Sequence, residues 1–386
     1  MDSPDDQGIT RFETLAVHEG RQVDPVSGAV TPAIQPSTTF ERDADGGYSR
    51  GHVYSRQSNP NRQQLETCLA ALEGGQSALA FASGSAATMS ILQLLRPGDH
   101  VLITDDAYHG SRHLLDTLFR QWGLQHDRVD TTDTEAVAAA IRPDTRLLWI
   151  ESPSNPLQGL SDLEALGALA SEHEIITVCD NTLASPVGQN PLRHGMDLVL
   201  HSSTKYLGGH SDLLGGAVIH RDNFAQAQAL RDIQSAGGAV PSAFDCWLLL
   251  RSLSTLSVRV RAQADSARTL MERLDEHPAV ETVFHAMHPN HPHRARAKQY
   301  LRGGGALFAF TVRGKADDAM RLVAATRLFT RATSLGGVES LIEHRASIEG
   351  PGTRTPDTLV RLSIGLEHVE DLWADLQQAL EHIRKD

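Results

Sequence analysis

The stretch HSSTKYLGGHSD, residues 201–212, follows an apolar run at 198–200 and holds one lysine, Lys205, ahead of a glycine pair. A lysine at a strand end is usually a solvated surface residue. Here the hydroxyl groups of Ser202 and Thr204 flank the amine and suit a phosphate, while the glycines let the backbone approach a ligand closely. A buried lysine in such surroundings can lose its proton and attack a carbonyl carbon. The stretch therefore predicts a lysine nucleophile beside a phosphate site.

Short apolar strands alternate with helices around this stretch. Helices are expected at 62–73 and 85–95, and strands at 78–82, 100–104, 146–150, 175–180 and 197–201. Such alternation indicates βαβ units and a mostly parallel sheet, which is an α/β fold. Right-handed crossovers then bring the carboxyl ends of the strands, and the ligand, to one edge of the sheet.

Composition and periodicity divide the chain into three predicted parts. Residues 1–60 mix Pro, Gly, Ser and Thr with short apolar pieces and no sustained helical period, which indicates an extended arm on another subunit. Residues 61–245 are expected to form the ligand-binding α/β domain, and residues 246–386 a linking helix and a smaller α+β domain. The later elements are expected as a helical stretch at 242–277, strands at 283–284, 306–312 and 359–364, and helices at 315–326 and 368–384.

Two further features support a cofactor site at the predicted edge. Asp180 ends a strand, where an aspartate often only caps a turn. A carboxylate at this place can instead keep a pyridine nitrogen protonated, as pyridoxal phosphate (PLP) enzymes require. The stretch ASGSAA, residues 82–87, lies between a strand and a helix, where free N–H groups attract anions. Small residues at such a turn often serve packing alone, so this signal depends on Lys205 and Asp180.

A series of motifs then resembles one family in order and over nearly the whole chain. The motifs are YSR at 54–56 with NP at 59–60, SGSAA at 83–87, ESPSNP at 151–156, DNT at 180–182, SSTKY at 202–206, SLGGVES at 334–340 and RLSIGLE at 361–367. Together they resemble the Cys/Met-metabolism PLP-dependent enzymes, which include cystathionine γ-synthase, cystathionine γ-lyase, cystathionine β-lyase and methionine γ-lyase. The resemblance implies fold type I, the aspartate-aminotransferase-like fold, and a homotetramer built as a dimer of dimers.

The resemblance also assigns roles to single residues. It implies that Lys205 carries PLP as a Schiff base and shuttles protons, while Asp180 pairs with the ring nitrogen and Tyr108 stacks on the ring. Lys205 and Tyr108 are the expected catalytic residues. The expected phosphate ligands are Gly84, Ser85, Ser202 and Thr204, with Tyr54 and Arg56 reaching the phosphate of the neighbouring subunit. The expected substrate-binding residues are Asn155, Ser334, Glu339 and Arg361. For Arg361, the residue by itself leaves a structural ion pair as the alternative to binding a substrate carboxylate.

The reaction within the family is less sharply indicated. Glu339 resembles the γ-synthase and γ-lyase pattern, where an acid meets the distal amine of cystathionine, although it could equally be a solvated turn residue. Val53 stands where those patterns have an acid, the stretch after Tyr108 lacks a cysteine, and residues 343–350 depart from the more usual His-Pro-Ala-Ser version. We expect γ-type chemistry on cystathionine or an O-acylhomoserine. Cystathionine β-lyase and methionine γ-lyase are the alternatives, ahead of an aminotransferase or a non-catalytic relative.

Composition excludes several other classes of function. A formal net charge of -13 disfavours a nucleic-acid partner. No signal peptide and no apolar run of about 20 residues is visible, so no membrane partner is expected. The three cysteines are widely spaced, which favours the reducing cytoplasm. Four histidines at 285, 288, 291 and 293 match no standard zinc spacing, and no metal is expected.

Overall fold

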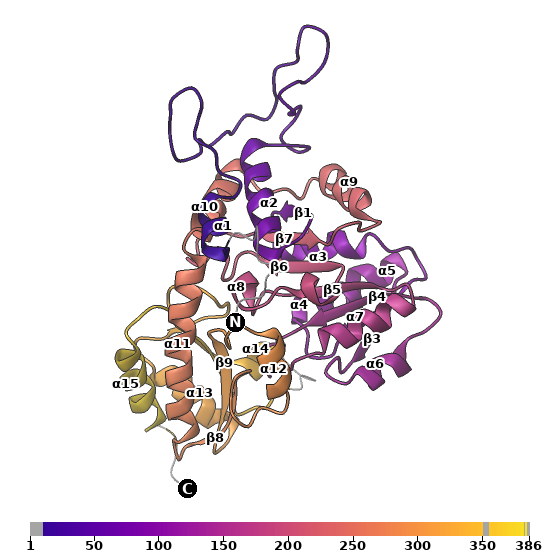
Figure 1. The fold of residues 1–386 in the computed structure, drawn as a ribbon. Helices are drawn as coiled ribbons and strands as arrows, with labels where there is room; N and C mark the ends of the chain where they lie inside the picture. Colours follow the sequence, from indigo (N-terminus) through magenta and orange to yellow (C-terminus); the bar gives the residue numbers. More distant parts are fainter. Residues whose placement is uncertain (1–10, 350–354, 382, 384–386) are drawn as a thin grey trace, which may run out of the picture.

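The larger of two sheets is built from strands between residues 77 and 220 (Figure 1). The computed structural model describes residues 11–349, 355–381 and 383. The seven strands are β1 (Ser77–Phe81), β2 (His100–Thr104), β3 (Gln125–Val129), β4 (Thr145–Glu151), β5 (Ile176–Asp180), β6 (Leu198–Ser202) and β7 (Gly216–His220). Their order is β1-β7-β6-β5-β4-β2-β3, and only β7 runs antiparallel to its neighbours. The predicted mostly parallel α/β sheet is confirmed.

Helices cover both faces of this sheet, because its strands are apolar on both sides. Successive residues of β2 show this: Val101 and Ile103 pack in one core cluster with α3, whereas Leu102 packs in another with α7. The helices of this part are α2 (Pro60–Glu73), α3 (Gly84–Leu92), α4 (His109–Leu114), α5 (Arg120–Trp122), α6 (Thr134–Ala140), α7 (Leu163–Glu172), α8 (Ser185–Gly188) and α9 (Ala227–Gly237), with a π-helical turn at Leu115–Phe119 and a 3-10 turn at Pro191–His194.

The second sheet lies in the last third of the chain. Its strands are β8 (Val280–Phe284), β9 (Leu307–Val312), β10 (Thr330–Arg331), β11 (Leu341–His344) and β12 (Leu359–Ser363), in the order β10-β11-β12-β9-β8. The helices are α10 (Ala243–Leu253), α11 (Leu256–Asp275), α12 (Arg294–Tyr300), α13 (Ala316–Ala325), α14 (Arg345–Glu349) and α15 (Val369–Leu380). The helix expected at 368–384 is α15, and residues 382 and 384 lie outside the described residues.

One continuous apolar core joins the two sheets. It includes Leu69 of α2, Val199 of β6, Leu250 of α10, Leu270 of α11 and Phe308 of β9. Helix α11 runs alongside the smaller sheet (Figure 1). Because this core is shared, the turn after β6 is held against the strands that carry the later motifs. The predicted domain boundaries at residues 60 and 245 stay predictions.

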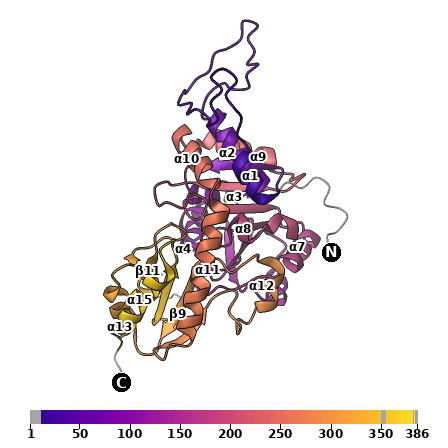
Figure 2. The same cartoon turned by 60° about the vertical axis from the view of Figure 1, so that its left-hand side comes forward.

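The expected arm is extended over most of its described length but begins with a helix. Helix α1 (Phe12–His18) buries Ala16 against the shared core, so the expectation of no helix in residues 1–60 is wrong here. Residues 1–10 of the arm lie outside the described residues. The chain that follows α1 projects from the body as long loops in both Figure 1 and Figure 2, and Val26 on it is 95% exposed.

Four strands and one helix break were not predicted. Strand β3 has the sequence QHDRV and is mostly polar, because it is an edge strand, and β7 follows a glycine-rich turn. Strands β10 and β11 have two and four residues, which is too short for a period to show. The helical stretch expected at 242–277 is divided between α10 and α11 at residues 254–255. Across the described ranges, no helix combines the length and apolar character needed to cross a membrane.

Candidate active site

Three neighbouring strands end in polar residues at one edge of the larger sheet. Strands β4, β5 and β6 end at Glu151, Asp180 and Ser202, and the register places Glu151 opposite Asp180. These residues line a cavity of about 350 Å³ together with Lys205 and Arg361. The parallel order of the strands therefore gathers residues far apart in sequence, as the sequence analysis expected.

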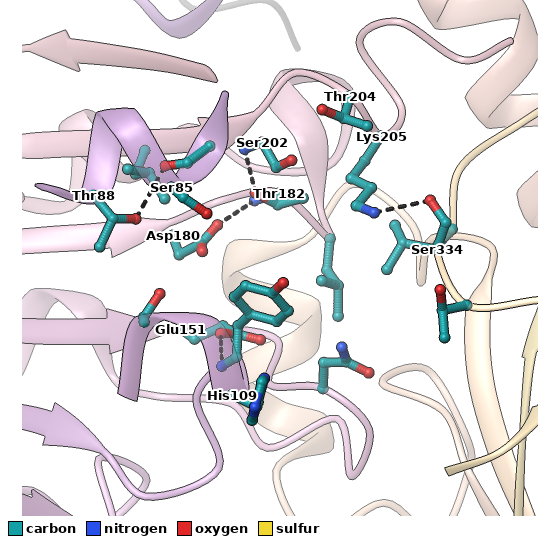
Figure 3. Close-up of a pocket in the computed structure, with 18 of the residues that line it drawn as sticks. Ser85, Thr88, His109, Glu151, Asp180, Thr182, Ser202, Thr204, Lys205 and Ser334 are labelled. Carbon is teal, nitrogen blue, oxygen red and sulfur yellow. Dashed lines mark hydrogen bonds between the residues drawn. The ribbon is translucent and has the colours of Figure 1, made fainter. Parts of the chain in front are cut away.

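Lys205 extends from the turn after β6 into this cavity (Figure 3). Its Nζ donates a hydrogen bond to Ser334 Oγ at 2.8 Å. Burial, and then the nearby Arg361 guanidinium, lowers the pKa of the amine. A neutral amine is the nucleophilic form of lysine, so the surroundings favour the state that attacks a carbonyl carbon.

Ser334 is held in place by its own backbone contacts. Its φ of 93° is uncommon for a residue with a side chain. The carbonyl oxygen of Ser334 accepts a hydrogen bond from Arg361 Nη2 at 2.8 Å. Arg361 therefore helps to position Ser334, whose hydroxyl accepts the hydrogen bond from Lys205.

Asp180 lies on the opposite side of the Lys205 amine from Ser334 in Figure 3. Its Oδ1 accepts a hydrogen bond from the Thr182 N–H at 3.1 Å. Burial raises the pKa of the carboxyl, against the opposing effect of the Thr182 contacts. A buried carboxylate is stabilised by a cationic partner, and a protonated ring nitrogen supplies that charge.

Glu151 is a site residue that the sequence analysis did not single out, although it opens the quoted ESPSNP motif. Its carboxyl group is buried, and Oε2 accepts a hydrogen bond from the Tyr108 N–H at 2.6 Å. Burial, followed by repulsion from Asp180, raises its pKa well above the usual range. Within the described ranges, Oε1 has no hydrogen-bond partner. Glu151 therefore fixes the backbone of Tyr108, which the sequence signal alone could not show.

Tyr108 lies at the mouth of the cavity, and 48% of its surface is exposed. It is the N-cap residue of α4. A Cβ on Gly110 would come within 2.3 Å of the Tyr108 ring, so a glycine is needed there for the ring to lie over the helix start. The exposed ring face is available to stack on a planar ligand.

The first turn of α3 forms an anion site at the other end of the cavity. Ser83 caps the helix by accepting from the Ala86 N–H at 3.1 Å, and the N–H groups at Gly84 and Ser85 begin the helix. A Cβ on Gly84 would lie 3.0 Å from the Ser202 Cβ, so only glycine fits without displacement. Thr204 lines the same cavity. These donors fit a phosphate group, because a helix N-terminus presents unpaired N–H groups.

Arg361 lines the cavity together with Asn155 and Ser334, the residues expected to bind the substrate. It is only 3% exposed, and its Nη1 donates to Asn155 Oδ1 at 3.2 Å. Its Nη2 also pairs with Glu343 Oε1 at 2.7 Å. Burial lowers the pKa of the guanidinium to about 10. The structural ion pair that the sequence left open is therefore present, and Arg361 nevertheless lines the cavity.

Three predicted site residues lie apart from this cavity. Tyr54 and Arg56 are on the projecting arm, where Arg56 Nη1 donates to the Ser235 carbonyl and its guanidinium lies 5.8 Å from the Tyr54 ring. Glu339 lines an adjoining cavity whose walls include Thr204 and Ser334, and it accepts a hydrogen bond from Ser211 Oγ. The described chain therefore does not bring Tyr54 or Arg56 to its own anion site.

The described residues contain no group of three or more His, Cys, Asp or Glu side chains that could hold a metal ion. His285 and His291 are instead packed in the protein, and burial lowers the pKa of each to about 4.

The sheet edge, the lysine amine, the buried acid and the anion site define a PLP-dependent enzyme of fold type I. A model of the family described as "Cys/Met metabolism PLP-dependent enzyme" matches residues 13–381. The chain belongs to this family of enzymes of sulfur amino-acid metabolism.

Curated relatives and solved structures agree with this assignment. The cystathionine gamma-synthase of Mycobacterium tuberculosis is 45% identical over 380 residues, which is 97% of this chain and 98% of that protein. The cystathionine beta-lyase of Coxiella burnetii is 41% identical, over 96% of this chain and 98% of that protein. The crystal structure of metB from Corynebacterium glutamicum has a TM-score of 0.95 and 40% identity, and covers 98% of this chain and 100% of that chain. The predicted class of enzyme, its cofactor and its fold are confirmed.

Proposed function

We propose that this enzyme catalyses γ-replacement or γ-elimination on cystathionine or an O-acylhomoserine. The observation that carries the proposal is the placement of two charged residues, Arg361 and Glu339, in two adjoining cavities, the first of which holds Lys205. Arg361 lies on one side of the cavity, and Glu339 lies in the adjoining cavity that shares Thr204 and Ser334. A guanidinium suits the α-carboxylate of an amino acid, and an acid suits a distal amine. Relatives named cystathionine gamma-synthase add support at 45% identity.

Lys205 is the proposed proton carrier of the reaction. Bound PLP supplies an electron sink for the charge that develops when the substrate α-proton leaves. The lowered pKa of Lys205 favours a neutral amine, which can accept that proton and return it at a neighbouring carbon. Ser334 Oγ, 2.8 Å from Nζ, holds the amine between proton transfers.

The cofactor-binding roles follow the geometry. We assign the phosphate to Gly84, Ser85, Ser202 and Thr204, the ring nitrogen to Asp180 and the ring face to Tyr108. We assign the substrate α-carboxylate to Arg361 and Asn155. Ser334 contributes to the same side through its carbonyl contact with Arg361.

A homo-oligomer completes the proposed site. Tyr54 and Arg56 lie on an arm that projects from the body (Figure 2) and carries exposed apolar side chains such as Val26 and Val30. We propose that the arm of residues 1–60 packs on a neighbouring subunit and brings these two residues to its phosphate, in a dimer of dimers. The remaining parts, 61–245 and 246–386, are the proposed PLP-binding and C-terminal domains.

Mixing two inactive variants tests the shared site. Arg56→Ala and Lys205→Ala subunits, refolded together in equal amounts, should recover about a quarter of wild-type activity. About half of the dimers are then mixed, and one of the two sites in each mixed dimer has both residues intact. No recovery in dimers proven to be mixed would contradict the arm's proposed role.

We also propose that the enzyme works in the cytoplasm. Its three cysteines, Cys68, Cys179 and Cys246, are free and buried, as is usual in a reducing compartment.

Product analysis tests the reaction itself. The purified enzyme with PLP is supplied with cystathionine, with an O-acylhomoserine plus cysteine, and with methionine. New cystathionine or 2-oxobutanoate is expected. Pyruvate with homocysteine would instead establish β-elimination, the alternative that the 41% identical cystathionine beta-lyase favours. Amino-group transfer with no reaction of these compounds would contradict the proposal.

A further inference from the structure

The segment at residues 343–349 gives this chain a second arginine in the cavity wall. The segment departs from the more usual His-Pro-Ala-Ser version, and Arg345 stands at the position of that proline. Arg345 begins α14, is 5% exposed and lines the same cavity as Lys205 and Arg361. A buried arginine beside a substrate-binding arginine requires a partner for its charge.

Four charged side chains of alternating sign are linked in series at this wall: Arg361, Glu343, Arg345 and Glu349. Glu343 Oε1 accepts from Arg361 Nη2 at 2.7 Å and from Arg345 Nη1 at 3.0 Å. Arg345 Nε donates to Glu349 Oε1 at 2.8 Å. The backbone register of β11 and β12 places Glu343 directly opposite Arg361, so their proximity is set by the sheet. The net charge of the four is zero.

The sharing of Glu343 limits how strongly it can hold Arg361. A carboxylate and a guanidinium form their strongest contact through two parallel hydrogen bonds. Here one oxygen of Glu343 serves both arginines, and Oε2 has no hydrogen-bond partner among the residues described. Because one oxygen of Glu343 is shared by two arginines, Glu343 does not occupy all the hydrogen-bond donors of Arg361. A substrate carboxylate then meets an arginine with donors still available.

We propose that Arg345 is a positioning residue for substrate binding, which draws Glu343 away from a two-bond contact with Arg361 and so keeps Arg361 available to the substrate carboxylate. This inference rests on the proposed function, in which Arg361 binds an amino-acid substrate. Glu349 orients Arg345 for the task, and Thr355 Oγ1 in turn donates to Glu349 Oε2 at 2.7 Å.

The test removes the Arg345–Glu349 pair as a unit. In Arg345→Met/Glu349→Gln, both charges of this pair are removed together, Glu343 and Arg361 keep each other as partners, and the net charge of the four positions stays zero. Glu343 can then accept hydrogen bonds from Arg361 with both of its oxygens. We expect the KM for the amino-acid substrate to rise about tenfold while kcat changes less than about twofold, because only the binding of the carboxylate is weakened.

A third substitution separates positioning from mere support. Adding Glu343→Gln to the double variant replaces the competing carboxylate by a neutral amide, which should bring the KM back to within about threefold of the wild-type value. If Arg345 only supports the wall, this third change leaves the KM unaltered or raises it further. Arg345→Gln/Glu349→Gln, which also removes both charges, is a second form of the test, and it serves if the methionine variant folds poorly.

Binding without turnover gives an independent readout. L-Alanine, which has no γ-substituent to lose, is titrated into the PLP-loaded protein and its Kd is read from the cofactor's visible absorbance. The Kd should follow the same rise and recovery as the KM. Arg273→Met is the matched control, because Arg273 pairs with Glu370 on the surface far from the cavity, and it should leave both constants unchanged.

The outcomes distinguish the two proposals. A wild-type enzyme that binds PLP and alanine while the KM and Kd of the double variant stay at wild-type values overturns the role of Arg345 alone. A rise that Glu343→Gln fails to reverse also overturns it. A wild-type protein that binds no amino acid overturns the proposed function and this inference together.

Discussion

The two sides of the active site are built in different ways. The cofactor side consists of strand ends and the turns that follow them, so Asp180, Glu151 and Lys205 owe their positions to one parallel sheet. The proposed substrate side consists of charged residues from β12 and α14, next to the second sheet, brought to the cavity by the shared core. The first side is a regular consequence of βαβ topology, whereas the second depends on how two sheets pack. Changes on the two sides should therefore affect different kinetic constants.

Lys205→Ala should give the largest effect, because its amine is the proposed proton carrier of the cofactor side. Turnover is expected to fall by about 10²–10⁴ or more. The measurement is kcat with excess PLP, together with borohydride reduction and peptide mapping, which should label Lys205 only in the wild-type protein. If the variant kept more than a tenth of the activity, another residue would carry the proton and the assigned cofactor side would be wrong.

Arg361→Met should affect the opposite side. Loss of a charge-assisted contact to a carboxylate corresponds to about 10–100-fold in binding, so the KM should rise by this factor. The affinity for PLP should change little, because Arg361 lies on the substrate side. Parallel titrations of PLP and substrate check both statements. Loss of PLP binding in a folded variant would remove the distinction between the two sides.

Two substitutions of Glu151 should affect PLP binding on the cofactor side to different extents. Burial raises the pKa of Glu151 and so favours the protonated carboxyl, for which Gln is a close substitute. Glu151→Gln should therefore keep the affinity for PLP within about twofold, since the amide oxygen still accepts from the Tyr108 N–H. Glu151→Ala removes that acceptor and should weaken PLP binding about tenfold. Equal losses in the two variants, measured by fluorescence titration, would show that Glu151 acts as a charge.

In the protein without PLP, Asp180 should give the smallest of these effects, and the effect is on stability. Because burial raises its pKa, the folded protein without PLP keeps this proton to a higher pH than the unfolded chain does. Its contribution to stability is present below the usual value of 3.8 and is lost as the pH rises through the raised pKa. Asp180→Asn cannot ionise, so it should raise the Tm of the PLP-free protein by a few degrees, about 1 kcal/mol, at neutral pH.

Thermal melts of the wild type and of Asp180→Asn at several pH values, with and without PLP, check this prediction. The stabilisation should disappear at low pH, where the wild-type carboxyl is protonated as well. PLP should reverse the order at neutral pH, because its cationic ring nitrogen favours the carboxylate over the amide. A variant that is less stable at every pH without PLP would contradict the explanation.

Particular residues show where prediction from the sequence ended. The predicted strands ending near Asp180 and Ser202 were correct because they are short apolar runs bounded by turns. Glu151 was missed because its motif was noted for its pattern, and a single carboxylate at a strand end does not reveal that it meets a tyrosine N–H. Arg345 was seen only as a departure from the usual motif. The proposed role of Arg345 depends on Glu343 and Arg361, which lie opposite each other on neighbouring strands. The local sequence pattern did not predict that these two strands pair.

The order of apolar strands, polar strand ends and glycines determined the α/β sheet and the predictions of a lysine nucleophile and a phosphate site, because each of these depends on residues close together along the chain. The sharing of Glu343 by two arginines, the closeness of Glu151 to Asp180 and the distance of Arg56 from its own anion site were decided by the tertiary structure. These features depend on strand register and on the packing of two sheets through one core, which bring together charges separated by many residues.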